Sequence, residues 1–119
     1  MTAVGLVTHP DYMAHETGRT HPERPERLRA VIEHLAATGL TKDLSPIEPV
    51  RAGLDSLERI HGPAYIRRVE EHCRAGRAVI DSMDTDISAR SYEVSLLAVG
   101  GGIAAADAIM EGAVRRAFA

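Results

Sequence analysis

The longest apolar segment of the chain follows a short polar stretch, Asp84 to Asp86, and continues to Gly112. Its apolar side chains are spread around most of a helical cylinder, a pattern typical of a helix that is buried on nearly every side. Ser88 is a candidate N-cap, because its hydroxyl can accept a hydrogen bond from a free amide of the first turn. Three consecutive glycines, residues 100–102, lie at the centre, and each costs a helix about 1 kcal/mol relative to alanine. We therefore expect a neighbouring backbone to approach this helix closely.

Two amphipathic helices and a buried strand precede this segment. Ala3–Thr8 is a continuous apolar run, which indicates a strand covered on both faces, as in a parallel sheet. Pro25 can occupy the first turn of a helix that Gly39 ends. The apolar stripe of this helix consists of Leu28, Val31, Ile32, Leu35 and Ala36. A second amphipathic helix is expected to begin near Pro63 and to end before Gly76. Its apolar face consists of Tyr65, Ile66, Val69 and Cys73.

The remaining segments give weaker patterns. Residues 44–50 contain two prolines and allow at most a short edge strand around Ile47. Residues 54–60 suggest a short helix, 78–83 are ambiguous between strand and loop, and 113–119 read as the opening of another strand. This alternation predicts an α/β architecture with a parallel sheet, which needs cover on both faces. The elements are too few for that cover, so we expect residues 1–119 to be an incomplete N-terminal segment of a single α/β domain.

Composition narrows the class of protein. The 119 residues are 45% hydrophobic and 26% charged, as in a globular domain, and the net charge of −3 argues against a nucleic-acid or anionic membrane surface. A single cysteine, Cys73, excludes an internal disulfide and suits a reducing compartment. No stretch has the pattern of a signal peptide, and Glu93 and Asp107 bracket the longest apolar run. We expect a cytoplasmic protein with neither a membrane nor a nucleic acid as partner.

The histidines raise the possibility of a metal site. Three of the six recur at six-residue intervals near the N-terminus: His9, His15 and His21. Metal sites usually pair ligands at shorter spacings, such as two histidines on one helix face. Hydrogen-bonding or capping histidines in a loop are therefore the favoured interpretation. His34 and His72 are expected to be solvated on polar helix faces.

Asp84 and Asp86 form the most interesting polar pair. Two carboxylates before a long apolar helix could bind a cation or accept amide hydrogens from a peptide-like ligand. Alternatively, they only complement the positive end of the helix dipole. The glycines 100–102 lack the pattern of a phosphate loop, and close helix packing explains them better. Cys73 is expected in the core.

Three motifs in order resemble the zinc-dependent histone deacetylase superfamily. They are His21-Pro22-Glu23-Arg24-Pro25-Glu26-Arg27-Leu28, then Ile60-His61-Gly62-Pro63-Ala64-Tyr65, then Asp84-Thr85-Asp86 through Ser91-Tyr92-Glu93 and the following Gly-Gly. The bacterial acetoin-utilisation and acetylpolyamine deacetylase branch is the most similar. The resemblance implies the N-terminal part of an arginase/deacetylase-like three-layer α/β fold, with a parallel sheet flanked by helices. It also implies hydrolysis of acetyl-amide bonds in acetyl-lysine peptides or acetylpolyamines, with a zinc-polarised carbonyl and a histidine general base.

The sequence also departs from the family. The tandem catalytic histidines, the zinc ligands and the oxyanion tyrosine follow, in the family, the strand that here begins near Arg116. The chain corresponds to about the first third of such a domain. We therefore assign no catalytic residue and no metal ligand. Zinc is expected in the full-length family but not in this chain alone, which we expect to be inactive by itself.

What the resemblance transfers to this chain is the rim of the active site. His21 and Pro22 would line the entrance, and Asp84 would hold the backbone amides of the substrate. Asp86 is the alternative if the loop register differs.

Arg27 matches a family arginine beside an internal cavity beneath the zinc. A surface ion pair of Arg27 with Glu23 or Glu26 remains an alternative interpretation.

A second functional class stays open. The chain could be a non-catalytic binding or assembly module that uses the rim loops or an exposed sheet edge to pair with another chain, including a second copy of itself. A small histidine metal-binding protein is a weaker third possibility.

Overall fold

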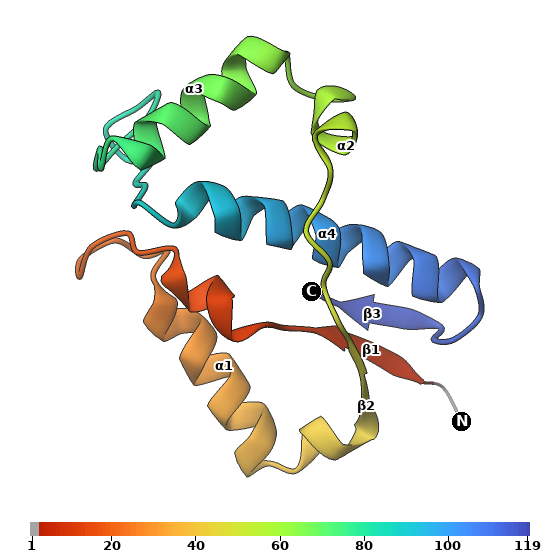
Figure 1. Cartoon of the computed structure of the whole chain (residues 1–119). Coiled ribbons are helices and arrows are strands. Elements are labelled where there is room, and N and C mark those ends of the chain that lie inside the picture. The colour runs from red at the N-terminus through yellow and green to blue at the C-terminus, as the bar shows by residue number, and fades with distance from the viewer. Residues whose placement is uncertain (1–2) are drawn as a thin grey trace.

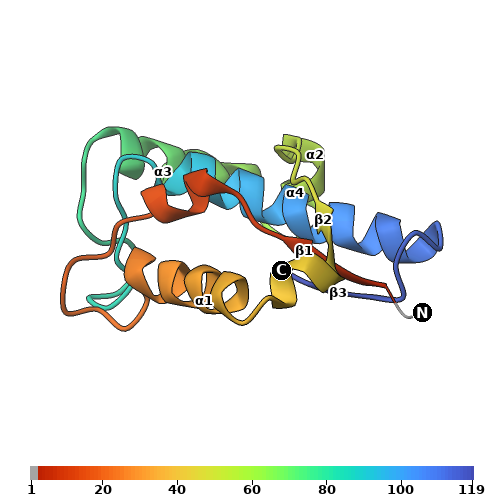
Figure 2. The same ribbon diagram turned by 90° about the horizontal axis from the view of Figure 1, so that it is seen from below.

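The computed structural model describes residues 3–119 and contains a three-stranded parallel sheet in the order β2-β1-β3. Helix α4 packs along one side of the sheet and α1 lies on the other, as the two orthogonal views show (Figures 1 and 2). The predicted α/β class and parallel sheet are therefore confirmed. The elements in order are β1 Val4–Val7, the 3-10 helix η1 Pro10–Ala14, α1 Pro25–Ala37, the 3-10 helix η2 Leu40–Asp43, β2 Leu44–Ile47, α2 Leu54–Glu58, α3 Pro63–Arg74, α4 Ser91–Met110 and β3 Arg116–Phe118.

The central strand of the sheet is β1, which pairs Val4 with Leu44 of β2 and with Arg116 of β3. Leu6 and Val7 on this strand are buried, as the continuous apolar run predicted. Strand β2 carries Pro46, and its place at an edge of the sheet leaves the missing amide hydrogen harmless.

The two predicted amphipathic helices, α1 and α3, form with the expected boundaries. Pro25 occupies the first turn of α1, and Gly39, just past its end, adopts the left-handed conformation with φ of 80°. On α3, Ile66 and Cys73 are buried against Tyr92 and Leu96 of α4, which makes the core cluster of this half of the molecule.

One member of the predicted apolar face of α3 lies at its exposed margin. Tyr65 is 36% exposed, and its hydroxyl donates a hydrogen bond to Asp81 outside the helix. Tyr65 thus lies on the predicted face, beside Ile66 and Val69, and its polar end finds a partner at the margin of the core.

Helix α4 differs from its prediction at its start. It begins at Ser91, and Ser88 lies outside it without capping its first turn. The Ser88 hydroxyl instead accepts a hydrogen bond from the Glu16 amide at 3.1 Å, across a long sequence separation. The assignment of Ser88 as N-cap was therefore wrong.

The predicted burial of α4 holds on only one side within residues 3–119. Val94, Leu96 and Ala105 are buried, whereas Ile103 and Met110 are 41% and 85% exposed. By length and composition alone the helix could cross a membrane, but the core helix of a layered domain meets the same criteria. Its contacts with all three strands account for the buried side.

The three glycines of α4 have different surroundings. A side chain at Gly100 would overlap the carbonyl oxygen of Val50, and the following Ala52 amide donates to the Leu96 carbonyl at 3.1 Å. The predicted close approach of a neighbouring backbone is thus confirmed at Gly100. Side chains rather than backbone face Gly101, and no described atom lies within 4 Å of a side chain placed at Gly102.

Candidate functional site: two loops at the carboxyl end of the sheet

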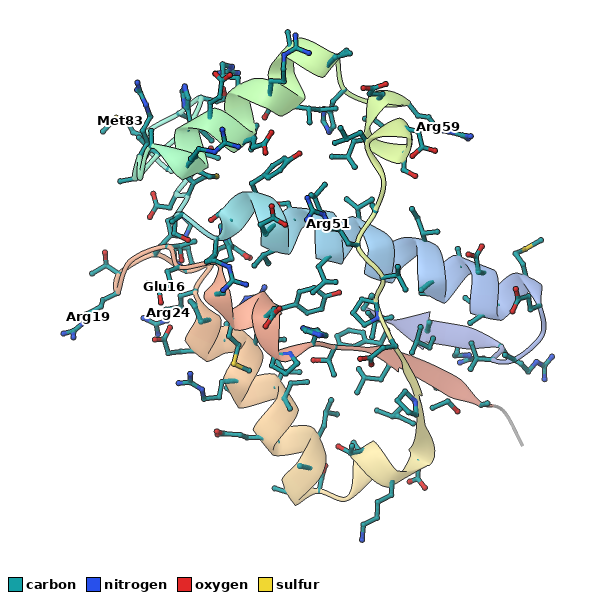
Figure 3. All side chains as sticks on the ribbon, in the orientation of Figure 1. Glu16, Arg19, Arg24, Arg51, Arg59 and Met83 are labelled. Atoms are coloured by element: carbon teal, nitrogen blue, oxygen red, sulfur yellow. The ribbon has the colours of Figure 1, made fainter. Side chains whose placement is uncertain are left out.

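Two polar loops lie at the same end of the molecule, beyond the carboxyl end of β1. We call residues 15–24 the entrance loop and residues 78–87 the carboxylate loop. In Figure 3, Arg19 and Arg24 lie on the entrance loop, and Met83 lies on the carboxylate loop near α3. In open parallel sheets, ligands bind outside the carboxyl ends of the strands. The position of both loops therefore fits a ligand site.

A 3-10 helix that the sequence did not predict starts the route to the entrance loop. His9 and His15 were both expected in a loop, but η1 occupies Pro10–Ala14 between them. His9 caps it by accepting a hydrogen bond from the Asp11 amide at 3.1 Å. The Tyr12 hydroxyl donates to the Leu97 carbonyl on α4 at 3.1 Å, in the space that Gly101 leaves open. These contacts attach the start of the loop to the long helix.

A cluster of hydroxyls joins the entrance loop to the start of α4. Ser91 Oγ lies 2.6 Å from His15 Nδ1 and accepts a hydrogen bond from the Ser88 amide at 2.8 Å. The Thr17 hydroxyl donates to the Glu23 carbonyl within the loop. Ser91 is only 4% exposed, so its contact with His15 links the entrance loop to the start of α4 below the surface.

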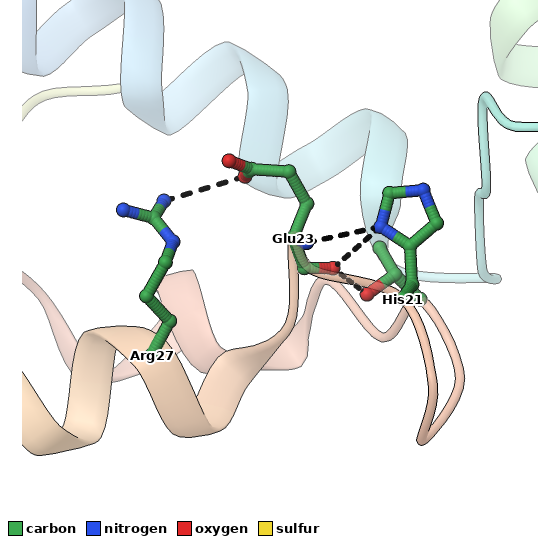
Figure 4. A network of polar contacts seen from close by, with 4 residues as sticks. His21, Glu23 and Arg27 are labelled. Atoms are coloured by element: carbon green, nitrogen blue, oxygen red, sulfur yellow. Dashed lines mark hydrogen bonds and ion pairs between the residues drawn. The ribbon is translucent and has the colours of Figure 1, made fainter.

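His21 bridges the two loops. Its Nδ1 accepts a hydrogen bond from the Glu23 amide at 3.0 Å, so in the neutral ring Nε2 carries the proton and donates to the Asp84 carbonyl at 2.8 Å. Figure 4 shows the contacts of His21 with the Glu23 backbone. The hydrogen bond to the Asp84 backbone, with the negative charge of Asp86 nearby, raises the pKa of His21. This bond fixes the backbone from which the Asp84 side chain projects.

The Asp84 carboxylate is exposed in the middle of the carboxylate loop. One of its oxygens accepts a hydrogen bond from the Ser82 hydroxyl at 2.7 Å. This bond, with smaller contributions from its own amide and from His21, lowers the pKa of Asp84. Asp84 is therefore an anion near neutral pH, with acceptor capacity directed to solvent.

Asp86 is less exposed than Asp84 and faces the entrance loop. Its Oδ2 lies 3.9 Å from the position that a side chain would take at Gly18. The structure thus brings together His21, Asp84 and Asp86, which the sequence analysis proposed as rim residues. Pro22 is exposed and lines, with His21 and Arg24, an open hollow of ≈ 450 Å³.

Arg27 forms the surface ion pair that was the alternative interpretation, and its place beside an internal cavity stays a prediction. Its guanidinium lies 3.3 Å from the Glu23 carboxylate, with both side chains more than 60% exposed, so the pair contributes little stability (Figure 4). Arg27 also lines a hollow of ≈ 370 Å³ between α1 and the end of β3, together with Leu28 and Phe118.

A further group of residues holds the carboxylate loop from the side of α3. Asp81 Oδ1 lies 2.6 Å from Arg68 Nη2, and Asp81 Oδ2 accepts a hydrogen bond from Tyr65 at 3.0 Å. The Arg68 guanidinium also lies 5.1 Å from the centre of the Tyr65 ring. Arg68 and Tyr65 together lower the pKa of Asp81, with Arg68 the larger cause. Sequence reasoning missed this group, because no pattern links a residue of an amphipathic helix to one particular acid in an irregular loop.

The three N-terminal histidines all make hydrogen bonds to protein groups, which is the interpretation favoured from the sequence. His34 is exposed as expected, but His72 is not well solvated: its Nδ1 is buried and has no hydrogen-bond partner among residues 3–119. Among residues 3–119, no three His, Cys, Asp or Glu side chains converge closely enough to hold a metal ion. The donor set of the described residues therefore does not fit a zinc site.

Known proteins resemble this chain in sequence and in fold. Residues 21–119 match the model of the histone deacetylase domain. A probable deacetylase of Archaeoglobus fulgidus is 36% identical over 117 residues, which cover 97% of this chain and 32% of that protein. The human polyamine deacetylase HDAC10 is 28% identical over 123 residues, covering 96% of this chain and 18% of that protein.

The fold of a solved structure is also similar. The crystal structure of the HDA15 HD domain superposes with a TM-score of 0.89 at 24% identity, covering 98% of this chain and 34% of that one. This chain thus spans about a third or less of the proteins that it matches. The matched residues include the entrance loop from His21 onward and the whole carboxylate loop. The chain therefore belongs to the histone deacetylase domain family.

Proposed function

We propose that this chain supplies the substrate-binding rim of a deacetylase that hydrolyses acetyl-amide bonds. The observation that carries the proposal is the link between the two loops: His21 holds the Asp84 backbone while the Asp84 carboxylate faces solvent. Such an arrangement fixes a hydrogen-bond acceptor at the entrance of a site without neutralising it. Membership of the histone deacetylase domain family supports the same conclusion.

The chemistry of the rim suits an acetyl-lysine peptide or an acetylated polyamine. A carboxylate can accept hydrogen bonds from peptide amides, or from the ammonium group of a polyamine. We assign this role to Asp84 rather than Asp86, because Asp84 is exposed whereas Asp86 is partly covered beside Gly18. His21 and Pro22 would then form the opposite side of the entrance.

We assign no step of the hydrolysis itself to residues 3–119. Zinc supplies carbonyl polarisation in the family that the motifs resemble. The acids and histidines described here do not converge on a common point, so we propose that the metal and the general base come from sequence outside this segment.

The experiment compares turnover by the protein expressed from its whole reading frame with that of Asp84→Asn and Asp86→Asn variants. Loss of a charge-assisted hydrogen bond costs about 1.5–3 kcal/mol, so Asp84→Asn should raise KM for an acetyl-lysine peptide or acetylputrescine about 10-fold or more. Asp86→Asn should change KM less. Asp55→Asn, an exposed acid at the start of α2, is the matched control. Unchanged KM in the Asp84 variant, or no turnover of any acetyl-amide by the wild type, would refute the proposal.

A second candidate function rests on exposed apolar surface. Strands β2 and β3 form the two edges of the described sheet, and Phe118 on β3 is 59% exposed. Ile103 and Met110 extend apolar surface along α4. An assembly module that pairs through these edges would sediment as a concentration-dependent oligomer. A monomer at all concentrations would argue against it.

A further inference from the structure

The carboxylate loop contains one turn with an unusual backbone. Asp81 has φ of 64°, the only non-glycine residue with positive φ among residues 3–119. The Ser82 amide donates to the Ile80 carbonyl at 2.7 Å, so Asp81 is the central residue of a three-residue turn. Turns of this kind with positive φ are rare and strained. A non-glycine residue stays in such a conformation only where its surroundings hold it there.

Two side chains of helix α3 hold Asp81 in this conformation. Arg68 and Tyr65 each take a different oxygen of the Asp81 carboxylate, at 2.6 and 3.0 Å. The Arg68 guanidinium also lies 5.1 Å from the centre of the Tyr65 ring, an arrangement that orients both donors toward Asp81. We call Arg68, Tyr65 and Asp81 the brace.

The brace is connected to Asp84 by a short path. Ser82, the residue after Asp81, donates from its hydroxyl to the Asp84 carboxylate at 2.7 Å. The Thr85 carbonyl accepts a hydrogen bond from the Ile80 amide at 3.0 Å, which closes the loop around Asp84. On the other side, His21 holds the Asp84 carbonyl. The loop is therefore held between α3 and the entrance loop.

We propose that Asp81, held by Arg68 and Tyr65, is a positioning residue that sets where the Asp84 carboxylate meets the substrate. The link to substrate rests on the proposed function, whereas the ordering of the loop by the brace does not. Without the brace, the loop keeps its bond to His21 and the packing of Ile87 against the core cluster, but it loses these polar contacts with α3. The Asp84 carboxylate then samples positions in which it does not reach the substrate, so binding weakens while the chemical step is retained.

Substitutions at Asp81 and Arg68 distinguish the effect of losing the brace from the effect of the strained backbone. Asp81→Gly adopts positive φ freely, so the turn is kept and only the brace is lost. Arg68→Met removes the ion pair, and Arg68→Lys restores the charge without the planar fork. Arg67→Met is the matched control, because Arg67 is the adjacent exposed arginine of α3 and forms no ion pair within the described residues 3–119.

Two readouts are measured on the protein expressed from its whole reading frame. Hydrogen exchange should be about 10-fold faster at the Ile80 and Thr85 amides in Asp81→Gly and Arg68→Met than in wild type. KM for an acetylated substrate should rise about 5-fold or more, with kcat within about 2-fold. Arg68→Lys should recover part of both effects, and Arg67→Met should match wild type.

The outcomes distinguish this inference from the proposed function. Exchange and KM that are unchanged in both Asp81→Gly and Arg68→Met would overturn the positioning role, and so would a fall in kcat with unchanged KM. If Asp84→Asn leaves KM unaltered, the proposed function fails, and the positioning of substrate fails with it. Faster exchange in the brace variants would then still establish the ordering of the loop. If Arg68→Met does not fold, Asp81→Gly and Arg68→Lys still decide the result.

Discussion

Replacing Gly100 by alanine tests the close crossing of the Val50–Ala52 segment over α4. The new Cβ would overlap the Val50 carbonyl oxygen and lie 2.6 Å from its carbonyl carbon. These are backbone atoms, so no rotamer change can relieve the overlap. The segment must move away, which breaks the hydrogen bond from the Ala52 amide to the Leu96 carbonyl. Gly102→Ala is the matched control, because a side chain there meets no described atom within 4 Å.

Gly100→Ala and Gly102→Ala should change the free energy of unfolding in opposite directions. Overpacking costs about 1–3 kcal/mol and the lost hydrogen bond about 1 kcal/mol, whereas alanine in place of glycine favours the helix by about 1 kcal/mol. Gly100→Ala should therefore lower the free energy of unfolding by about 1–3 kcal/mol. Gly102→Ala should raise it by up to about 1 kcal/mol.

The assay is urea unfolding followed by circular dichroism at the helix signal. The two variants differ in the free energy of unfolding by about 1–4 kcal/mol, so with an m-value of about 1–3 kcal/mol/M their urea midpoints should differ by about 0.3–4 M. The reasoning would be refuted if Gly100→Ala were as stable as Gly102→Ala. That result would mean that Val50 does not cross α4 at this glycine.

Three further predictions follow from single contacts. Tyr12→Phe removes the hydrogen bond to the Leu97 carbonyl and should lower the free energy of unfolding by about 1 kcal/mol in the same assay. An unchanged free energy of unfolding would show that water replaces the tyrosine hydroxyl as the partner of this carbonyl. Burial raises the pKa of the Cys73 thiol, which is 1% exposed. Cys73 in the native protein should therefore react with iodoacetamide far more slowly than in the urea-unfolded protein, and equal rates would contradict its burial. Because the folded state raises the pKa of His21, its stabilising contribution is full below the unfolded pKa of about 6.5 and is lost as pH rises through the higher folded value. The stability difference between wild type and His21→Gln should accordingly be larger at pH 5.5 than at pH 8, and a larger difference at pH 8 would contradict it.

The regular elements could be predicted because their signals are local. Pro25 and Gly39 mark the ends of α1, and the apolar stripe between them gives its period. The uninterrupted apolar run ending at Val7 was enough to predict a buried parallel strand. The glycines of α4 predicted a close neighbour, which the structure identifies as Val50 at Gly100.

The start of α4 and the arrangement of the loops could not be predicted, because they depend on contacts between distant residues. Ser88 has a side chain that can cap a helix, but its hydroxyl accepts a hydrogen bond from the Glu16 amide instead, and α4 begins at Ser91. His21, Asp84 and Asp86 were identified from motifs, whereas the hydrogen bond that joins His21 to the Asp84 backbone required the folded structure.

The contacts of Arg68 and Tyr65 with Asp81 also could not be predicted from the sequence. A left-handed backbone at Asp81 costs about 1–3 kcal/mol, a strain that only the surrounding structure can maintain. The Arg68–Asp81 pair is about 40% exposed on each side, so its contribution to global stability is about 0–1 kcal/mol. The Arg68–Asp81 pair therefore affects the conformation of the carboxylate loop more than the stability of the fold.

The central claim is that the carboxylate loop presents Asp84 to an acetylated substrate. A crystal structure of the protein, expressed from its whole reading frame and bound to an acetyl-lysine peptide or acetylputrescine, tests it most directly. We predict a carboxylate oxygen of Asp84 within about 3.2 Å of a substrate N–H nitrogen, with the His21 bond to the Asp84 carbonyl kept. A substrate bound away from both loops, with Asp84 in solvent, would contradict the claim.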